Sequence, residues 1–392
     1  MSFLKPDSFF KPEFDDLDFT GISRIAVPNM GKPDLLPLWF GEGDAVTPEF
    51  IRRAAQQALD DGQTFYANAR GIPALRDTLK TYLDRLYGLD LNPDRLLVPG
   101  PTMITVAMAA QASLTRGDQA LVVSPYWPNI ERAIQITGAE VISYAQEQRN
   151  GRWFLDVDGL IAAVTDRTRL IYVNSPCNPS GWVMTPEQQA QLLEFCRARN
   201  ILLLADEVYH RLVFEGDVAP SFLSIARDDD PLIVVNGFSK SWAMTGWRLG
   251  WMVVPADRLE QFMVMAQCFT TGAPTFIQAG GIAALQDGEP LVRELREQYR
   301  AGRELVMQRL GGHPRIEVLR PEGAFYAFPR IKGLNDSLAF AQTLVEQENV
   351  GVAPGYTFGP GFDGHIRLSF AQSHSRLSSA LDGLLHHLDK TA

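Results

Sequence analysis

The chain is poor in the features that mark secreted, membrane-spanning and disulfide-bonded proteins. Its 392 residues include only 3 cysteines, without CxxC spacing, so we predict no disulfide framework and a cytoplasmic location. The first residues, MSFLKPDSFFKPEFDD, contain no apolar segment of the kind found in signal peptides. Apolar runs such as ILLLA are far shorter than the roughly 20 residues that a membrane helix requires, so we expect no membrane association.

Basic clusters and metal-ligand motifs are also missing. The formal net charge is -10 and no long basic run occurs, which argues against a nucleic-acid partner, because such proteins need a positive surface to bind phosphates. The 6 histidines form neither an HExxH motif nor a ligand spacing with the cysteines. We therefore expect no metal site.

Hydrophobic residues, by contrast, make up 46% of the chain, which is enough for a large core. From about residue 47, helix-like segments alternate with short runs that are apolar on both faces. Such runs are typical of buried strands, so we predict an α/β fold with a mostly parallel sheet flanked by helices. The runs are QALVVSP, RLIYVNSP, ILLLADE, LIVVNGF and LGWMVVP.

Two of the predicted helices begin with the same N-capping pattern, a threonine followed by a proline. TPEFIRRAAQQALDDG starts with Thr47 as the expected N-cap, followed by a proline, and ends at Gly62. TPEQQAQLLEFCRARN starts with Thr185, and Gln188 stands three residues later, as a capping box requires.

The pattern changes after about residue 285. A long charged helix, two strand-like segments, a helix, the strand HIRLSF and a last helix predict a smaller α+β domain. We therefore divide the chain into an N-terminal arm (1–45) that packs irregularly on the small domain, a large α/β domain (46–285) and the small domain (286–392).

Chemically reactive side chains follow several of the predicted strands. Asn178 follows RLIYVNSP, Asp206 and Tyr209 follow ILLLA, and Ser239 and Lys240 follow LIVVNGF. Each could be an ordinary cap or turn residue. Because the carboxyl ends of parallel strands form one crevice, we expect these residues to converge there.

Four segments in this order, NSPCNPSG, ADEVYHRLVF, GFSKSWAMTGWRLG and HIRLSF, resemble those of the pyridoxal-phosphate-dependent class I aminotransferases, which have the aspartate aminotransferase-like fold type I. The resemblance extends from about Gly41 to the C-terminus. It implies pyridoxal phosphate as cofactor, amino acid and 2-oxo acid substrates, and a ping-pong cycle through pyridoxamine phosphate.

By its place in the motif, Lys240 resembles the lysine that forms an imine with the cofactor and then acts as general base and acid. Asp206 matches the carboxylate that keeps the ring nitrogen protonated. Asn178 and Tyr209 resemble the pair that bonds the ring oxygen O3′. Glu207 points the opposite way along its strand and is expected to be structural.

The cofactor phosphate needs cations and amide donors. Arg248 matches the phosphate arginine of the family. Gly100 leads into an apolar helix whose N-terminus should face the anion. Pro101 departs from the usual pattern because it has no N–H, so Thr102 is the better donor.

Two further phosphate contacts are implied. Many relatives carry a serine where this chain has Gly237, and we expect Ser239 to substitute in part. Tyr66 resembles the tyrosine that reaches the phosphate of the neighbouring subunit, which implies a homodimer with shared active sites.

The resemblance also assigns the ring and substrate contacts. Trp127 is expected to stack on the cofactor ring. Arg367, in HIRLSF, matches the arginine that binds the substrate carboxylate, assisted by Asn178 and by the backbone of Gly41.

Three other activities would require sequence features that differ from those of this chain. A C–S β-lyase uses this fold, but Trp182 directly follows the motif glycine, whereas lyases favour a tryptophan further along. A non-catalytic ligand sensor would carry a DNA-binding domain, for which the first forty residues are too few. A dehydrogenase would need a glycine-rich fingerprint that is missing here.

The substrate side chain is left open by the sequence. A dicarboxylate would need a second cation, which Arg70, Arg24 or Lys32 could supply. The apolar segment LLPLWF would suit a hydrophobic or aromatic amino acid equally well.

Overall fold

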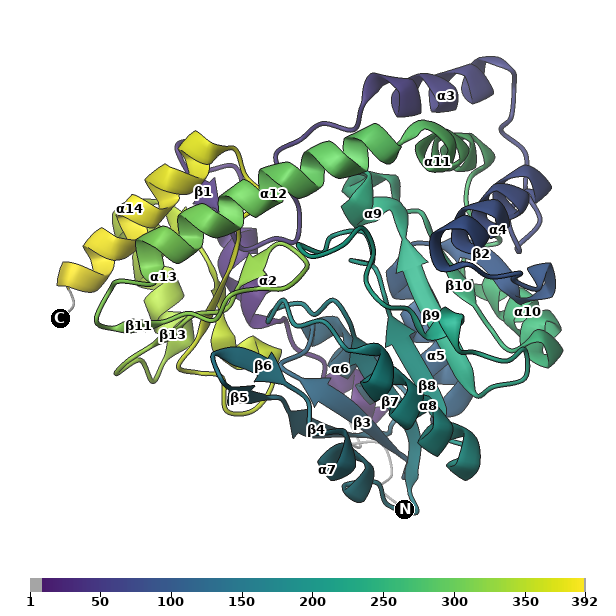
Figure 1. Ribbon diagram of the computed structural model, residues 1–392, viewed down its shortest axis with the longest axis horizontal. Coiled ribbons are helices and arrows are strands. Elements are labelled where there is room, and N and C mark those ends of the chain that lie inside the picture. Colours follow the sequence, from purple (N-terminus) through teal and green to yellow (C-terminus); the bar gives the residue numbers. More distant parts are fainter. Residues whose placement is uncertain (1–8, 391–392) are drawn as a thin grey trace.

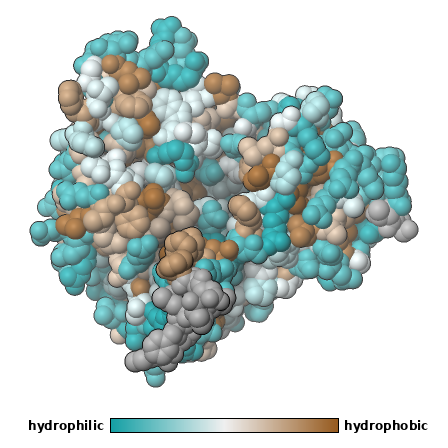
Figure 2. Space-filling view, turned by 180° about the vertical axis from the view of Figure 1, so that it is seen from behind, coloured by the Kyte–Doolittle hydropathy of each residue, from teal (hydrophilic) through white to brown (hydrophobic). Residues whose placement is uncertain are grey.

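The computed structural model describes residues 9–390, which form two lobes (Figure 1). The larger lobe is built on the central sheet, and the smaller lobe contains the C-terminal helices and short strands. Seen from behind, the surface is hollowed between the two lobes (Figure 2). None of the helices within residues 9–390 has both the length and the hydrophobicity needed to cross a membrane.

The central sheet has seven strands in the order β2-β10-β9-β8-β7-β3-β4. β10 is antiparallel to both of its neighbours, and the remaining pairs are parallel, so the expected mostly parallel sheet is confirmed. The strands are β2 (Leu96–Gly100), β3 (Gln119–Ser124), β4 (Glu140–Ala145), β7 (Thr168–Asn174), β8 (Leu202–Asp206), β9 (Leu232–Gly237) and β10 (Gly250–Val253).

The sheet is apolar on both faces because helices cover both. Leu204 of β8 lies in a core with Val106 and Met108 of helix α5, whereas its neighbours Leu203 and Ala205 face the opposite core. All of these side chains are buried. This arrangement explains why the strands are continuous apolar runs rather than alternating ones.

Helices precede and follow the strands in the large lobe, and α5 lies behind the sheet with α8 in front of it (Figure 1). These helices are α3 (Glu49–Asp60), α4 (Pro73–Tyr87), α5 (Thr102–Ser113), α6 (Pro128–Gln135), α7 (Val157–Ala162), α8 (Pro186–Arg199), α9 (Phe238–Ser241), α10 (Leu259–Phe269) and α11 (Thr275–Asp287). Short 3-10 turns of this lobe are η1 (Pro93–Arg95), η2 (Phe222–Ser224), η3 (Thr245–Trp247) and η4 (Ala256–Arg258), and η5 (Gly355–Phe358) lies in the small lobe.

The small lobe is reached through the long helix α12, and its strands form short sheets β11-β13 and β12-β16-β15. Its elements are α12 (Glu289–Leu310), β11 (Ile316–Glu317), β12 (Tyr326–Ala327), β13 (Arg330–Ile331), α13 (Ser337–Glu348), β14 (Val350–Gly351), β15 (Ala353–Pro354), β16 (Ile366–Ser369) and α14 (His374–Lys390). A hairpin of β5 (Glu147–Arg149) and β6 (Arg152–Phe154) belongs to the large lobe.

The N-terminal segment is more regular than expected. It contains α1 (Pro12–Asp15), the nine-residue helix α2 (Gly21–Asn29) and β1 (Leu36–Pro37), which pairs in parallel with β14. Thr20 caps α2 by accepting a hydrogen bond from the backbone N–H of Ser23.

One of the two predicted caps is confirmed and the other is wrong. Thr185 and Gln188 form the capping box of α8. Thr47, however, does not cap α3, whose N-cap position is Pro48. Its hydroxyl donates instead to the carbonyl of Ala243 and accepts from the indole of Trp247, so a tertiary contact replaces the local one.

Candidate active site

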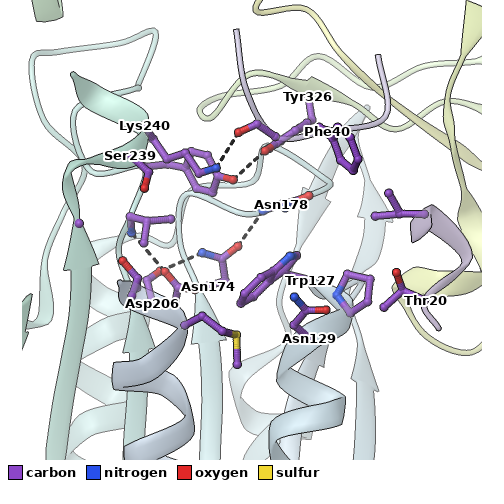
Figure 3. A pocket seen from close by; sticks show the side chains of 18 of the residues that line it. Thr20, Phe40, Trp127, Asn129, Asn174, Asn178, Asp206, Ser239, Lys240 and Tyr326 are labelled. Atoms are coloured by element: carbon purple, nitrogen blue, oxygen red, sulfur yellow. Dashed lines mark hydrogen bonds between the residues drawn. The ribbon is translucent and has the colours of Figure 1, made fainter. Parts of the chain in front are cut away.

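A cavity of about 360 Å³ lies at the carboxyl ends of β7, β8 and β9, and several of its lining residues are shown in Figure 3. Of the predicted site residues, those that line it are Gly41, Thr102, Trp127, Asn178, Asp206, Tyr209, Ser239, Lys240, Arg248 and Arg367. Residues from both lobes and from the N-terminal segment therefore meet in one place. This position is where open α/β sheets bind their ligands.

The buried end of the cavity holds a carboxylate. Asp206, the last residue of β8, accepts a hydrogen bond from the Tyr172 hydroxyl at 2.9 Å and one from the Val208 N–H at 3.2 Å. Burial raises the pKa of Asp206 to about 6. A partner that carries a positive charge at this position would stabilise the ionised form and lower this pKa.

Asn174 connects this carboxylate to the middle of the cavity. Its amide donates to the Asp206 carbonyl at 2.9 Å, and its side-chain oxygen accepts from the N–H of Asn178 at 2.7 Å (Figure 3). Asn174 therefore fixes the strand end and the loop that carries Asn178 relative to each other.

Lys240 approaches the cavity from the helical turn that follows β9. Its Nζ donates to the carbonyl of Gly41 at 2.6 Å and lies 6.0 Å from the centre of the Tyr209 ring. Burial, followed by the positive charge of Arg367, lowers the pKa of Lys240 to about 8. About a tenth of this amine is therefore neutral at pH 7, far more than for an unperturbed lysine.

Gly41 is a glycine because its surroundings leave no room for a side chain. A Cβ at this position would collide with the Tyr326 hydroxyl and would stand 3.3 Å from Lys240 Nζ. The Tyr326 hydroxyl in turn lies 2.8 Å from the Tyr209 hydroxyl. This close approach brings the N-terminal segment, the small lobe and the lysine together.

Arg367 is a buried guanidinium only partly satisfied by the protein. It is 2% exposed, and its Nη1 donates to Asn178 Oδ1 at 3.0 Å while Nη2 donates to the Trp39 carbonyl. The guanidinium lies over the ring of Tyr326 at 4.6 Å, and its Nε has no hydrogen-bond partner within residues 9–390. Such a group is suited to bind a carboxylate ligand.

The N-terminus of α5 and Arg248 form a polar region suited to an anion. Thr102 is the first residue of α5, and its hydroxyl donates to the Asn236 carbonyl at 3.0 Å. Arg248 is exposed, and its Nη1 donates to the Thr245 carbonyl at 2.7 Å. A Cβ at Gly237 would collide with the Thr102 hydroxyl, so glycine at 237 fits beside Thr102 without a shift of that side chain.

Two predicted residues lie outside the lining of the cavity. Gly100 is buried at the end of β2 with φ +143, where it lets the strand turn toward α5. Tyr66 is 92% exposed and does not approach the cavity of its own chain. Glu207 also faces elsewhere, because it accepts hydrogen bonds from Ser221 and from the N–H of Phe222.

Several lining residues were missed by the sequence analysis. Asn174 stands four residues before Asn178 at the end of a predicted strand, so its position there could have revealed it. Tyr326 and Phe40 carried no such signal, because they reach the cavity through long-range packing. The others are Thr20, Ile22, Ser23, Trp39, Met103, Pro128, Asn129 and Val208.

Comparison with known proteins agrees with this geometry. The family model "Aminotransferase class I and II" matches residues 37–384. The aspartate aminotransferase of Pyrococcus horikoshii is 32% identical over 352 residues, covering 89% of each chain. The aromatic-amino-acid aminotransferase 2 of Thermococcus litoralis is 34% identical, covering 90% of this chain and 91% of the relative.

A solved structure extends the agreement to three dimensions. The aspartate aminotransferase from Thermus thermophilus with maleate superposes with a TM-score of 0.89 at 30% sequence identity, covering 97% of this chain and all of the other. The chain therefore belongs to the class I and II aminotransferase family. Its activity is the transfer of an amino group between an amino acid and a 2-oxo acid.

Proposed function

We propose that this aminotransferase uses pyridoxal phosphate and converts L-amino acids in a ping-pong cycle. The observation that carries the proposal is the convergence of Lys240, Asp206 and Arg367 on one cavity. These side chains provide an amine with a lowered pKa, a buried carboxylate and a carboxylate-binding guanidinium. Transamination requires all three functions at one site.

The lining residues fit this cofactor. Asp206 would hold the ring nitrogen, and Asn178 and Tyr209 would bond the ring oxygen, with Trp127 against the ring face. The phosphate would be bound by Arg248 and by a set of neighbours, namely Thr102, Ser239, the backbone at Gly100, and Tyr66 of a second subunit. When bound, pyridoxal phosphate supplies an electron sink for the bond that breaks at the substrate Cα.

The chain's own residues would bind the substrate and move its proton. Arg367 binds the α-carboxylate through its guanidinium, next to the backbone of Gly41 and the side chain of Asn178. This contact fixes the Cα position relative to Lys240. Lys240 Nζ would then accept the proton from the substrate Cα as general base and give it up at a different carbon as general acid, and its lowered pKa of about 8 favours this exchange.

A half-reaction separates the aminotransferase from the alternative C–S β-lyase. Incubated with one amino acid and no 2-oxo acid, the holoenzyme should form one equivalent of 2-oxo acid per site and then stop. We expect an absorbance change that saturates at the site concentration, followed by renewed turnover once a 2-oxo acid is added. Continuous release of pyruvate and ammonia from cystathionine or cysteine would instead establish a lyase.

We further propose a homodimer in which Tyr66 completes the partner's site. Support comes from exposure, because Phe65 is 84% and Tyr66 92% exposed in the single chain, which is unusual for adjacent aromatic residues in a monomer. Loss of one phosphate contact should weaken cofactor binding about tenfold.

Mixed dimers test this arrangement. Tyr66→Ala and Lys240→Ala chains are each expected to be impaired, but a hybrid of the two contains one site with both Lys240 and a partner's Tyr66. Mixing should therefore restore activity at limiting pyridoxal phosphate. If Tyr66 acts within its own chain, no site of the hybrid is intact and mixing restores nothing.

The division into arm (1–45), large domain (46–285) and small domain (286–392) is also proposed, with support from the pairing of β1 with β14. A cytoplasmic location remains part of this proposal, in keeping with the low cysteine count.

A further inference from the structure

Within residues 9–390, the cavity lining contains no cation beyond those that the reaction itself requires. Among the described residues that line it, the charged side chains are Lys240, Arg248, Arg367 and Asp206. In the proposed function, Lys240 transfers the proton, Arg367 binds the α-carboxylate and Arg248 binds the phosphate. No positive charge of this chain's own lining is left for a second substrate carboxylate.

The wall that faces Lys240 across the cavity is uncharged. It is formed by the start of α2, by Phe40 and by the first turn of α6. In Figure 3, Thr20 and Asn129 lie on the side away from Asp206, beyond Trp127, and Phe40 lies above them. The residues of this uncharged wall are Thr20, Ile22, Ser23, Phe40, Pro128 and Asn129.

The position of α2, and hence of Ile22, is fixed by packing against the small lobe. The N–H of Gly21 donates to the Thr357 hydroxyl at 3.2 Å. A Cβ at Gly21 would stand 2.8 Å from the Tyr356 hydroxyl and 2.9 Å from Pro354, so the helix is in close contact with η5 and β15. The first turn of α2 is therefore held against the cavity.

The cations that could have served a dicarboxylate substrate are engaged or located elsewhere. Arg70 donates through Nε to the Leu96 carbonyl at 3.0 Å and pairs with Asp94 at 3.1 Å. Arg24 follows Ser23 directly, but it pairs with Asp18 and does not line the cavity. Lys32 is exposed and also lies outside the lining.

We propose that the amino donor carries an uncharged, predominantly apolar side chain, and that Ile22 with Phe40 selects it. The proposal rests on the proposed function, because it assumes that Arg367 binds the α-carboxylate. An aspartate or glutamate side chain would find no cation on this wall, where Ile22 and Phe40 lie among uncharged neighbours. Burying an unpaired carboxylate is strongly unfavourable, whereas an aliphatic or aromatic side chain gains from leaving water.

Single-turnover kinetics of the holoenzyme with individual amino acids tests the proposal. We expect kcat/KM for leucine, methionine or phenylalanine to exceed that for aspartate and glutamate by about 100-fold or more. A preference for aspartate or glutamate would overturn the inference and leave the aminotransferase intact. Conversion of no amino acid at all would instead remove the proposed function.

Substitutions at Ile22 test the residue itself. Ile22→Arg should raise the kcat/KM ratio of glutamate to leucine at least about tenfold, because it adds the missing cation. Ile22→Ala should shift preference from leucine toward the larger phenylalanine, a second test that does not depend on placing a charge. Arg24→Gln is the matched control, since Arg24 lies on the same helix outside the cavity, and its ratios should equal those of the wild type. Unchanged ratios in both folded Ile22 variants would overturn the assignment.

Discussion

Lys240→Ala is expected to lower turnover by about 10,000-fold or more, because it removes the amine that moves the Cα proton. No other lysine lines the cavity within residues 9–390. The measurement is the rate of 2-oxo acid formation at saturating pyridoxal phosphate. Lys32→Ala, which alters an exposed lysine outside the cavity, is the control and should retain full activity. Activity of Lys240→Ala within tenfold of the wild type would refute the assignment.

The lowered pKa of Lys240 can be measured directly by acylation of its amine, with Lys240→Ala identifying the signal. Only the neutral amine reacts with an acylating reagent, and a lowered pKa means that the neutral form appears at lower pH. In the cofactor-free protein, the fast labelling that Lys240→Ala abolishes should therefore have its midpoint near pH 8 rather than 10.5. A midpoint near 10.5 would show that the amine is not in the buried, cation-rich site described above.

Asp206→Asn is expected to reduce turnover by about 100- to 1,000-fold, the effect of leaving a buried charge on the cofactor without its partner. Pyridoxal phosphate affinity should fall in parallel. The measurements are steady-state kinetics and equilibrium titration with the cofactor. Glu207→Gln is the matched control because Glu207 is adjacent but bonds Ser221 and Phe222 outside the cavity. A normal rate in Asp206→Asn would contradict the role.

The same substitution should have the opposite effect on the stability of the cofactor-free protein. The pKa of Asp206 is raised from 3.8 to about 6, so the folded state holds the proton more tightly than the unfolded state. Above pH 6, where Asp206 is ionised in both states, its burial therefore lowers the free energy of unfolding by on the order of 3 kcal/mol. Below about pH 4, where it is protonated in both states, this destabilisation disappears. Cofactor-free Asp206→Asn should melt at or above the wild-type temperature at pH 8, and thermal denaturation at pH 5 and 8 measures this difference.

The predictions from sequence were most successful where chemistry and local structure coincide. Strand runs that end at or shortly before Asn178, Asp206 and Lys240 indicated both the sheet and the residues at its carboxyl edge. These positions are determined by short segments of chain, since a buried strand followed by a turn already fixes where the next side chain lies.

What the sequence could not predict depends on contacts between distant segments. Tyr326, Phe40 and Ile22 reach the cavity only because the small lobe and the N-terminal segment pack over the sheet. Thr47 shows the same limit, because its local pattern predicted a helix cap but its hydroxyl bonds Ala243 and Trp247. The local sequence predicts the hydrogen bond of such a threonine only when no group elsewhere in the fold competes for its hydroxyl.

The contact between Thr102 and Gly237 has a consequence for how this family can vary. The two positions are 135 residues apart, yet one hydroxyl occupies the space that a side chain at 237 would need. Serine at 237 would therefore require the Thr102 side chain to move away from the Asn236 carbonyl to which it now donates. We expect substitutions at these two sites to be coupled, so that the beginning of α5 and the end of β9 vary together.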